Sequence, residues 1–270
     1  MIRADYHVHS DFSSDSEAPM ESVIDRAIEL GLERICFTDH MDYDFPMTST
    51  YTFVFEPFSY FRKLCELQEQ YQGKIKILKG IELGLQPHLG EDYQKLIDSH
   101  PFDFILGSTH LVQKVDPYLP VYWETHKKEE GIRLYFEEIT ENLRNYKGFL
   151  INGHLDYMIR YAPGTNEDFT YKKYSDTIDT MLRTIIESGK GIEINTSGFK
   201  YQLTVPHPHT DIIKRYKELG GELITIGSDA HKPEHLAYDF NKAEELLLEL
   251  GFRYYSVFEE QKPILLPLGK

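Results

Sequence analysis

The sequence has few cysteines and no long apolar run, and each shortage excludes a class of protein. Its two cysteines, Cys36 and Cys65, lack the spacing of a metal or redox site, so both are expected to be reduced core residues in a reducing compartment. No apolar run approaches the roughly 20 residues of a membrane-spanning helix. The N-terminus continues directly into a predicted strand, without a signal peptide. We therefore expect a cytoplasmic protein without a membrane partner.

Positive charge is also scarce. The 270 residues include 29 Lys and Arg against 44 Asp and Glu, which gives a formal net charge of −15. No basic run is longer than a pair such as Lys127-Lys128, whereas a nucleic-acid groove needs a stripe of basic side chains. A nucleic-acid partner is therefore not expected. The excess of carboxylates suits a site that holds several divalent cations.

Strand-like and helix-like patterns alternate along the whole chain. No linker, repeat or low-complexity segment interrupts them, so residues 1–270 are expected to form a single domain. Short apolar runs predict seven strands and a weaker eighth, at residues 2–8, 34–38, 74–81, 102–108, 149–152, 191–195, 223–227 and 254–258. Such alternation predicts parallel strands with helices outside, as a closed barrel or an open doubly wound sheet. No Gly-rich phosphate loop follows the first strand, which disfavours a nucleotide-binding open sheet.

Two long segments show neither the helical nor the strand-like spacing of apolar residues. Residues 41–55 are aromatic and polar, and residues 111–128 contain two prolines and the single tryptophan, Trp123. Loops of this length in a compact domain are usually functional, so residues 41–55 are a candidate lid over a pocket. Aromatic side chains suited to wall such a pocket are Tyr43, Tyr118, Trp123 and Tyr161.

Histidines and carboxylates recur where predicted strands end. His7 and His9 are two residues apart on the first strand, so their side chains share one face. At or just after the C-terminal ends of later predicted strands lie Asp39, His40, Glu82, His110, His154, Asp229 and His231. In a parallel barrel these strand ends converge on one rim, where such enzymes keep their chemistry. A lone His-x-His pair is more often a surface feature, but the agreement of six strand ends favours a metal site.

The donor types indicate which metals are suitable. Imidazoles and carboxylates without a thiolate suit Zn, Mn or Fe. With Asp15 included there are about nine donors, more than the four that a single zinc site uses, so two or three divalent ions with a bridging carboxylate are expected. Ions about 4 Å apart lower the pKa of a bound water and neutralise charge on a transferring phosphoryl group. The predicted chemistry is therefore hydrolysis of a phosphate ester.

The ordered series of these residues resembles a known family. His7-Val8-His9, Asp39-His40, Glu82, His110, His154 and Ser228-Asp229-Ala230-His231 are similar to the motifs of the PHP (polymerase and histidinol phosphatase) family. The resemblance implies an α/β fold, a distorted seven-stranded (β/α)7 TIM-like barrel, with a multinuclear metal site at the C-terminal ends of its strands. The chain's length, its lack of fused domains and the loop with Arg160 are most similar to the stand-alone histidinol-phosphate phosphatases of histidine biosynthesis.

The resemblance also implies how the ligands are shared among three ions. The first ion would be held by His7, His9, Glu82 and Asp229, the second by Glu82, His110 and His154, and the third by Asp15, His40 and His231. Glu82 would bridge the first two ions. Asp15 departs from one common variant of the pattern, which has His there, so the affinity and metal preference of the third site differ from that variant. Asp39 is expected to orient a ligand from behind it.

The reaction implied is hydrolysis of L-histidinol phosphate to L-histidinol and phosphate, a small-molecule phosphomonoester. A metal-bridging hydroxide, on ions whose ligands include Glu82 and Asp229, would attack phosphorus in line. The leaving alkoxide would be protonated by His231 or a metal-bound water, or stabilised directly by the third ion. Arg160 and Lys200 are predicted to bind the phosphate, because Arg can do so in bidentate fashion and Lys acts as a point charge.

Several other polar residues are weaker candidates. Asp116 and Asp156 could meet a substrate ammonium or imidazolium. His207-Pro208-His209 imitates the opening motif, but it lies between a predicted loop and a helix start and is not expected to bind metal. The remaining histidines are expected to be surface or structural residues; these are His88, His100, His126 and His235.

Two rival functions stay open. One is another phosphoesterase of the same family, namely a protein tyrosine phosphatase, a nucleotide phosphatase or an exonuclease, of which the negative charge disfavours the last. The other is a metal-binding but catalytically idle domain, which would usually have lost ligands. Oligomeric state is left unknown by the sequence. Loss of turnover in Glu82→Ala would show that the site is catalytic, whereas unchanged activity would favour the idle domain.

Overall fold

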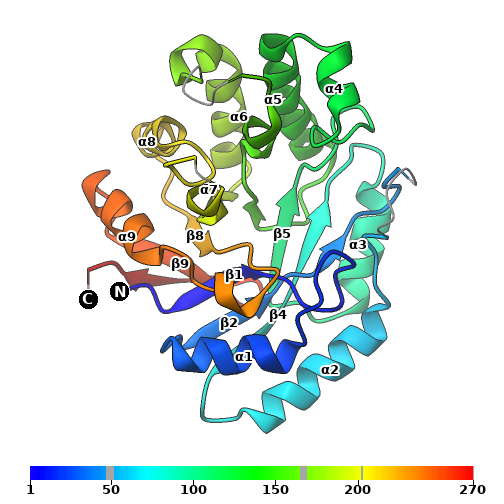
Figure 1. Cartoon of the computed structure of the whole chain (residues 1–270), viewed down its shortest axis with the longest axis vertical. Coiled ribbons are helices and arrows are strands. Elements are labelled where there is room, and N and C mark those ends of the chain that lie inside the picture. The colour runs from blue at the N-terminus through cyan, green and yellow to red at the C-terminus, as the bar shows by residue number, and fades with distance from the viewer. Residues whose placement is uncertain (47–51, 165–168, 202, 270) are drawn as a thin grey trace.

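The computed structural model describes residues 1–46, 52–164, 169–201 and 203–269. Its centre is a nearly closed barrel of seven parallel strands that alternate with helices (Figure 1). Neighbouring strands around the barrel are β1 (Ala4–Val8), β2 (Arg34–Phe37), β4 (Lys76–Gly84), β5 (Phe104–Ser108), β6 (Ile151–Asn152), β7 (Gly191–Asn195) and β8 (Ile224–Gly227). The prediction of a distorted seven-stranded barrel is therefore confirmed.

A short eighth element does not add a position to the barrel. β3 (His40–Met41) pairs with β4 in parallel, as β2 does, but further along, with His40 opposite Glu82. β2 and β3 are thus two pieces of one strand position, interrupted at Thr38 and Asp39. The interruption brings His40 beside the carboxylate of β4.

Backbone hydrogen bonds connect β1 to the residues that follow β8. Asp229 N donates to His7 O at 2.8 Å, and His9 N donates to Ala230 O at 2.9 Å. The buried Asp5 carboxylate accepts hydrogen bonds from the Ser228 amide at 2.9 Å and the Ser228 hydroxyl at 2.6 Å. These bonds join the first strand to the last, so an open doubly wound sheet does not describe the fold.

A bulge in β1 lets two consecutive side chains, Tyr6 and His7, both point into the barrel. Asp5 pairs with Ile35 and Val8 pairs with Phe37, so β1 uses three steps where β2 uses two. The extra residue breaks the usual alternation of faces. Tyr6 reaches the lower interior, 5.2 Å from the ring of Phe104, while His7 still faces the upper rim.

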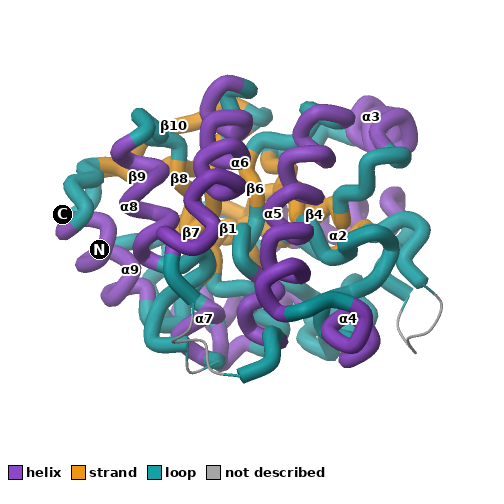
Figure 2. Tube along the Cα trace, turned by 90° about the horizontal axis from the view of Figure 1, so that it is seen from above, coloured by secondary structure: helices purple, strands orange, loops and turns teal. Residues whose placement is uncertain are grey.

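The helices surround the barrel (Figures 1 and 2). They are α1 (Met20–Glu29), α2 (Pro57–Gln70), α3 (Gly90–Ser99), α4 (Pro120–Thr125), α5 (Lys128–Asn145), α6 (Ser175–Glu187), α7 (Ser197–Lys200), α8 (Thr210–Glu218) and α9 (Phe240–Glu249). The 3₁₀ turns are η1 (Tyr157–Tyr161), η3 (Tyr171–Tyr174) and η4 (Pro233–His235). Figure 2 shows α5 and α6 side by side outside the strands, where Arg133 of α5 contacts Asp176 of α6 at 2.8 Å.

The weak eighth strand of the sequence lies outside the barrel. β9 (Tyr254–Glu259) pairs antiparallel with β10 (Lys262–Pro267) as a separate hairpin. It packs against the N-terminal ends of the barrel strands, where Tyr6 Oη donates to Phe258 O at 2.8 Å and Lys76 Nζ lies 2.6 Å from Glu259 Oε2. The hairpin covers this end of the barrel, so the opposite rim is the one available for a site.

Four local expectations need correction or restriction. Cys65 is exposed on α2 instead of lying in the core, whereas Cys36 is buried as expected. The predicted exit loop over 196–200 is mostly helix α7, and the segment 111–128 contains helix α4. Of the candidate lid over 41–55, residues 47–51 lie outside the described residues. In the described part of the chain, no helix is both long enough and apolar enough to cross a membrane.

Candidate metal centre

All nine predicted metal donors come together at the C-terminal rim of the barrel. Seven of them line one cavity of about 420 Å³, namely Asp15, His40, Glu82, His110, His154, Asp229 and His231. His7 and His9 are fully buried below it and contact Glu82 and Asp229. Residues from six strand ends, separated by more than 200 positions in sequence, therefore share one site.

The first group of donors is compact. Nε2 of His7 and Nε2 of His9 are 3.1 Å apart, and they lie 3.4 and 3.6 Å from Glu82 Oε2. Oδ1 of Asp229 lies 3.7 and 3.5 Å from the same two nitrogens. Tetrahedral ligands about 2.1 Å from a zinc ion are separated by about 3.4 Å, so the two imidazole nitrogens have the right spacing from each other and from each carboxylate oxygen for one such cation.

Asp229 reaches this group through an uncommon backbone conformation. Its φ angle is 53°, in the left-handed region that Asp tolerates better than most residues. The turn comes directly after β8, and it directs the carboxylate back toward His7 and His9.

The second group uses the other oxygen of Glu82. Oε1 of Glu82 lies 3.1 Å from His154 Nε2 and 3.4 Å from His110 Nε2, and these two nitrogens are 3.4 Å apart. Each oxygen of one buried carboxylate thus faces a different set of imidazoles. Each of its two oxygens can therefore serve a different donor group.

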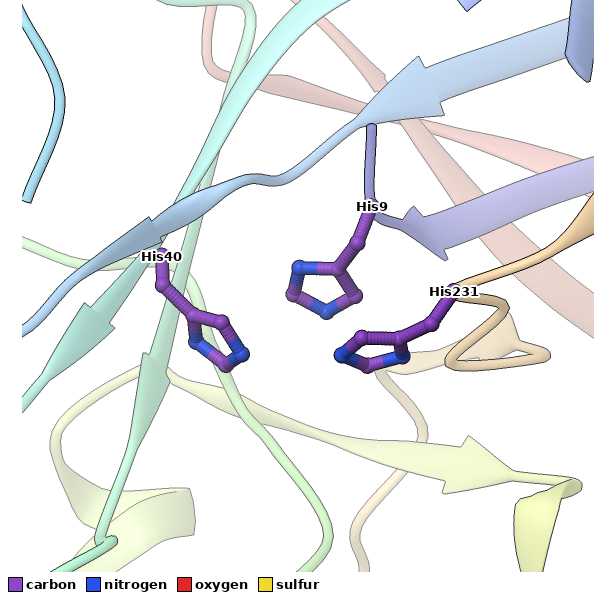
Figure 3. A group of neighbouring side chains, drawn as sticks. All are labelled: His9, His40 and His231. Carbon is purple, nitrogen blue, oxygen red and sulfur yellow. The ribbon is translucent and has the colours of Figure 1, made fainter. Parts of the chain in front are cut away.

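The third group lies nearer to solvent. Oδ2 of Asp15 is 3.1 Å from His231 Nε2 and 3.6 Å from His40 Nε2. Figure 3 shows His9, His40 and His231 turned toward one another, and each offers a nitrogen within 4.8 Å of the others. The side chains of Asp15 and His231 are 27% and 26% exposed, so this group is the most accessible of the three.

The protonation of the imidazoles fits a cation site. Burial, with the neighbouring His231 and His40, lowers the pKa of His9 to about 3, so its ring is neutral and keeps a lone pair. Burial would also lower the pKa of His110, but Asp42 and Glu82 outweigh it and raise the pKa to about 10. Metal binding at His110 must therefore release a proton.

One buried oxygen is unsatisfied by the protein itself. Glu82 Oε2 accepts no hydrogen bond within the described residues, although His7, His9 and His40 each place a nitrogen 2.9–3.6 Å away. An unsatisfied buried charge is costly, and a metal ion relieves that cost. The residues present therefore fit divalent cations.

Further polar residues hold the imidazoles from behind. Nδ1 of His7 is 2.6 Å from Glu193 Oε1, and Nδ1 of His110 is 2.5 Å from Asp42 Oδ2. Such contacts fix the tautomer, so that the nitrogen facing the cavity carries the lone pair. Nδ1 of His9 is 3.1 Å from Ser13 Oγ.

Asp39 is connected to His9 through Ser13. The Ser13 hydroxyl donates to Asp39 Oδ1 at 2.7 Å, and Asp39 also accepts from the amide and hydroxyl of Ser10. Asp39 therefore lies behind His9, and not behind its sequence neighbour His40.

Sequence reasoning missed Glu193 and Asp42. Glu193 and Asn195 alternate with isoleucines in β7, a polar pattern like that of His7 and His9, and Asp42 follows His40 by two residues. Glycines give both carboxylates room. A Cβ at Gly227 would lie 2.4 Å from Glu193 Oε1, and one at Gly84 would lie 2.2 Å from Asp42 Cγ.

Asp42→Asn is expected to weaken metal binding. The amide carries no charge and supports the His110 tautomer less well, and loss of such a partner usually costs about 10- to 100-fold in metal affinity or activity. Competition with a chromogenic zinc chelator measures the affinity directly. The matched control is Asp44→Asn, which alters the exposed Asp44–His88 pair and should leave zinc affinity unchanged. Equal zinc affinity in Asp42→Asn and the unmodified protein would contradict this role.

The two basic side chains predicted to bind phosphate, Arg160 and Lys200, lie on another wall of the same cavity. The Arg160 guanidinium donates to Ser197 Oγ at 3.0 Å and lies 4.0 Å from the centre of the Tyr201 ring. No carboxylate of the described residues forms an ion pair with Arg160. Lys200 also lines the cavity, with Nζ 3.5 Å from His235 Nδ1, and burial lowers its pKa. This wall can bind an anion.

The weaker sequence candidates divide between the cavity and its surroundings. Asp116 lines the cavity. Asp156 does not, because its carboxylate binds His207 Nδ1 at 2.5 Å and the His209 amide at 2.7 Å. His235, expected to be a surface or structural residue, lines the cavity.

The aromatic wall differs from the one expected. Of the four predicted aromatics only Tyr161 lines the cavity, together with Phe45, Phe53, Tyr157 and Tyr201. Tyr43 instead stacks on Tyr93, and Trp123 donates its indole N–H to Pro117 O. Sequence position alone did not tell which of the chain's 19 tyrosines face the cavity.

Comparisons with known proteins agree on one group of relatives. A family model for the PHP domain matches residues 5–197. A histidinol-phosphatase from Lactococcus lactis subsp. lactis (strain IL1403) is 34% identical over 97% of this chain and 96% of its own length. A probable histidinol-phosphatase from Clostridium acetobutylicum is 34% identical over 88% of this chain and 90% of its own length.

A solved structure has the same fold along nearly its whole length. The crystal structure of histidinol phosphate phosphatase from Lactococcus lactis subsp. lactis Il1403, complexed with Zn, L-histidinol and phosphate, covers 97% of this chain and 98% of its own. The TM-score is 0.89 and the sequence identity is 32%. That relative binds zinc and both products of a phosphate-ester hydrolysis.

Proposed function

Because this chain belongs to the PHP domain family, we propose that it hydrolyses L-histidinol phosphate to L-histidinol and phosphate. The observation that carries the proposal is its similarity, along almost the whole chain, to a solved histidinol phosphate phosphatase with both products bound. The cavity described above supplies what this reaction needs, with metal donors on its floor and cations on one wall. The chain is therefore a metal-dependent phosphomonoesterase that takes part in histidine biosynthesis.

The metal content is the first finer part of the proposal. The donor set supports two or three divalent ions, chosen among Zn, Mn and Fe. His7, His9, Glu82 and Asp229 would hold one ion, Glu82, His110 and His154 a second, and Asp15, His40 and His231 a third. When bound, such ions make water a strong nucleophile near neutral pH and neutralise charge on the phosphoryl oxygens.

Arg160 and Lys200 are proposed to hold the phosphate. A guanidinium presents parallel N–H groups to two phosphate oxygens, and the bond to Ser197 fixes its direction. The guanidinium also lies over the ring of Tyr201, 4.0 Å from its centre, which helps to hold it in this position. Lys200 adds a second positive charge at the same wall, so a phosphate bound there would lie in the same cavity as the metal donors.

Protonation of the leaving alkoxide involves the third donor group, which contains Asp15, His40 and His231. His231 has two possible roles, because its imidazole can bind the third ion or donate a proton to the alkoxide. Its Nε2 lies 3.1 Å from the carboxylate of Asp15, which favours the role of metal ligand, and the proton for the alkoxide would then come from a water bound at this third donor group. Glu82 and Asp229 would hold the ions that supply the nucleophile, and neither transfers a proton in this scheme.

Steady-state kinetics on a panel of phosphomonoesters test the function. We expect kcat/KM for L-histidinol phosphate to exceed that for p-nitrophenyl phosphate, phosphotyrosine and nucleoside monophosphates. A value for L-histidinol phosphate no higher than that for p-nitrophenyl phosphate would defeat the substrate assignment. A preference for phosphotyrosine or a nucleotide would identify one of the rival phosphatases instead.

Arg160→Ala is expected to lower kcat/KM about 10²- to 10³-fold, the range seen when one donor to a developing oxyanion is removed. The inhibition constant of inorganic phosphate should rise as well, because the guanidinium binds the product anion too. Arg62→Ala, at an exposed position on α2, is the control and should change neither value. Unchanged phosphate inhibition in Arg160→Ala would place this residue outside the phosphate site.

The same proposal covers the chain as a whole. Residues 1–270 are taken as one domain, since the C-terminal hairpin packs against the barrel and Met1 N lies 3.0 Å from Glu244 of α9. The partner is a small molecule, and the cytoplasmic location is proposed from the cysteine content and the biosynthetic role.

A further inference from the structure

One carboxylate in the cavity has no task in the metal centre. The described lining residues include five acids, of which Asp15, Glu82 and Asp229 belong to the metal groups and Asp42 holds His110. The fifth is Asp116. No Lys, Arg or His of the described residues forms an ion pair with it.

Two groups of the chain contact the same carboxylate oxygen of Asp116. Its Oδ1 accepts a hydrogen bond from the Tyr118 amide at 2.8 Å and lies 3.5 Å from the Tyr157 hydroxyl. No group in the described part of the chain donates to Oδ2. Burial raises the pKa of this carboxyl to about 6, so it is still mostly ionised at neutral pH. An ionised, partly buried group without a cation is costly, and a cationic ligand would remove that cost.

Tyr157 separates Asp116 from the proposed phosphate-binding wall. The guanidinium of Arg160 lies over the Tyr157 ring, 5.7 Å from its centre, and the hydroxyl of the same ring is 3.5 Å from Asp116 Oδ1. The cavity thus carries a positive group and a negative group on either side of one tyrosine. A ligand with an anion and a cation a few bonds apart matches this polarity.

The proposed substrate has this charge pattern. In L-histidinol phosphate the ammonium-bearing carbon is next to the CH₂ that carries the phosphate ester. An ammonium has three N–H donors and is charged at neutral pH, whereas a free imidazole is mostly neutral there. A carboxylate is therefore better matched to the ammonium than to the imidazole.

We propose that Asp116 binds the ammonium of the substrate, with the hydroxyl of Tyr157 beside it, and thereby selects amino-alkyl phosphates over simple phosphomonoesters. This inference rests on the proposed function, and it assigns a specificity role to a residue outside the metal and phosphate sites. The ammonium nitrogen donates to Oδ2, while the backbone amide of Tyr118 keeps Oδ1 in place.

The test is Asp116→Asn, which keeps the shape of the side chain and removes its charge. Three substrates are compared: L-histidinol phosphate, 3-(imidazol-4-yl)propyl phosphate without the ammonium, and 2-aminopropyl phosphate without the imidazole. The variant should lose about 10- to 100-fold in kcat/KM on both amino substrates, the range that a hydrogen bond to a charged group supports. On the substrate without ammonium it should stay within about threefold of the unmodified enzyme.

Product inhibition gives an independent readout. In Asp116→Asn the inhibition constant of L-histidinol should rise by a similar factor, while that of inorganic phosphate should not change. Asp44→Asn serves again as the control, with no effect on any of the three substrates.

Two outcomes would overturn the proposal. Equal losses on the substrates with and without ammonium would show a general effect on the site. A loss that follows the imidazole and spares 2-aminopropyl phosphate would assign Asp116 to the ring instead. Failure of the proposed function is recognised separately, because the unmodified enzyme would then show no preference for L-histidinol phosphate over p-nitrophenyl phosphate.

Discussion

Glu82→Ala is expected to abolish turnover of L-histidinol phosphate while the barrel stays folded. Glu82 is fully buried and places one oxygen in each of two donor groups, so its removal damages both at once. Loss of a residue that only supports a ligand costs about 10- to 100-fold. The loss in kcat/KM for this shared ligand should go well beyond that range.

Two companion variants make the result interpretable. Glu82→Gln preserves volume and one carbonyl oxygen, and it should also be inactive, because a neutral amide cannot bridge two cations. Glu137→Gln, at an exposed position on α5, should retain full activity. Circular dichroism should show the same helix content in all three proteins. Activity of Glu82→Ala equal to that of the unmodified enzyme would favour an idle metal-binding domain.

Removal of metal is expected to destabilise the protein and to stop catalysis. Without cations, carboxylate oxygens and imidazole nitrogens of the rim lie 2.9–3.7 Å apart, and the buried Glu82 Oε2 accepts no hydrogen bond within the described residues. A ligand at 100 times its dissociation constant stabilises a folded protein by about 2.7 kcal/mol. For a chain of this size that corresponds to a fall in Tm of about 5–10 °C on chelation.

The measurement is a thermal melt before and after chelation, with metal content determined by elemental analysis. Zinc should restore both the Tm and the activity, and Mg²⁺ should not, since it prefers oxygen ligands to imidazoles. In Glu82→Ala, chelation should shift the Tm much less. A chelated protein that is free of metal yet keeps its Tm and full activity would refute a catalytic metal centre.

Much of the fold could be predicted from periodicity alone. Parallel strands buried on both faces are continuous apolar runs, as in Phe104-Ile105-Leu106, and the amphipathic segments between them are helices. The C-terminal strand was predicted from its pattern, but no partner was predicted for it. β9 pairs antiparallel with β10 below the barrel, and strand periodicity contains no information about which strand is the neighbour.

The candidate site could be predicted in part for a similar reason. The metal donors follow strand ends, and the topology of a parallel barrel gathers all such ends at one rim. The carboxylates that support these imidazoles cannot be found from the positions of strand ends. Glu193 supports His7 across 186 positions and Asp42 supports His110 across 68, and both contacts depend on neighbouring strands and on glycines that leave room.

The sequence by itself determined the chemistry available to this protein: which donor types it has, that they follow strands, and that its charge disfavours nucleic acid. Only the tertiary structure decided which acid does what. Asp116 and Asp156 were equivalent candidates in the sequence, yet Asp156 is bound to His207, whereas Asp116 faces the cavity without a cation among the described residues. The physical reason is that a carboxylate's role depends on its nearest charges and hydrogen-bond donors, and those come from segments far away in the chain.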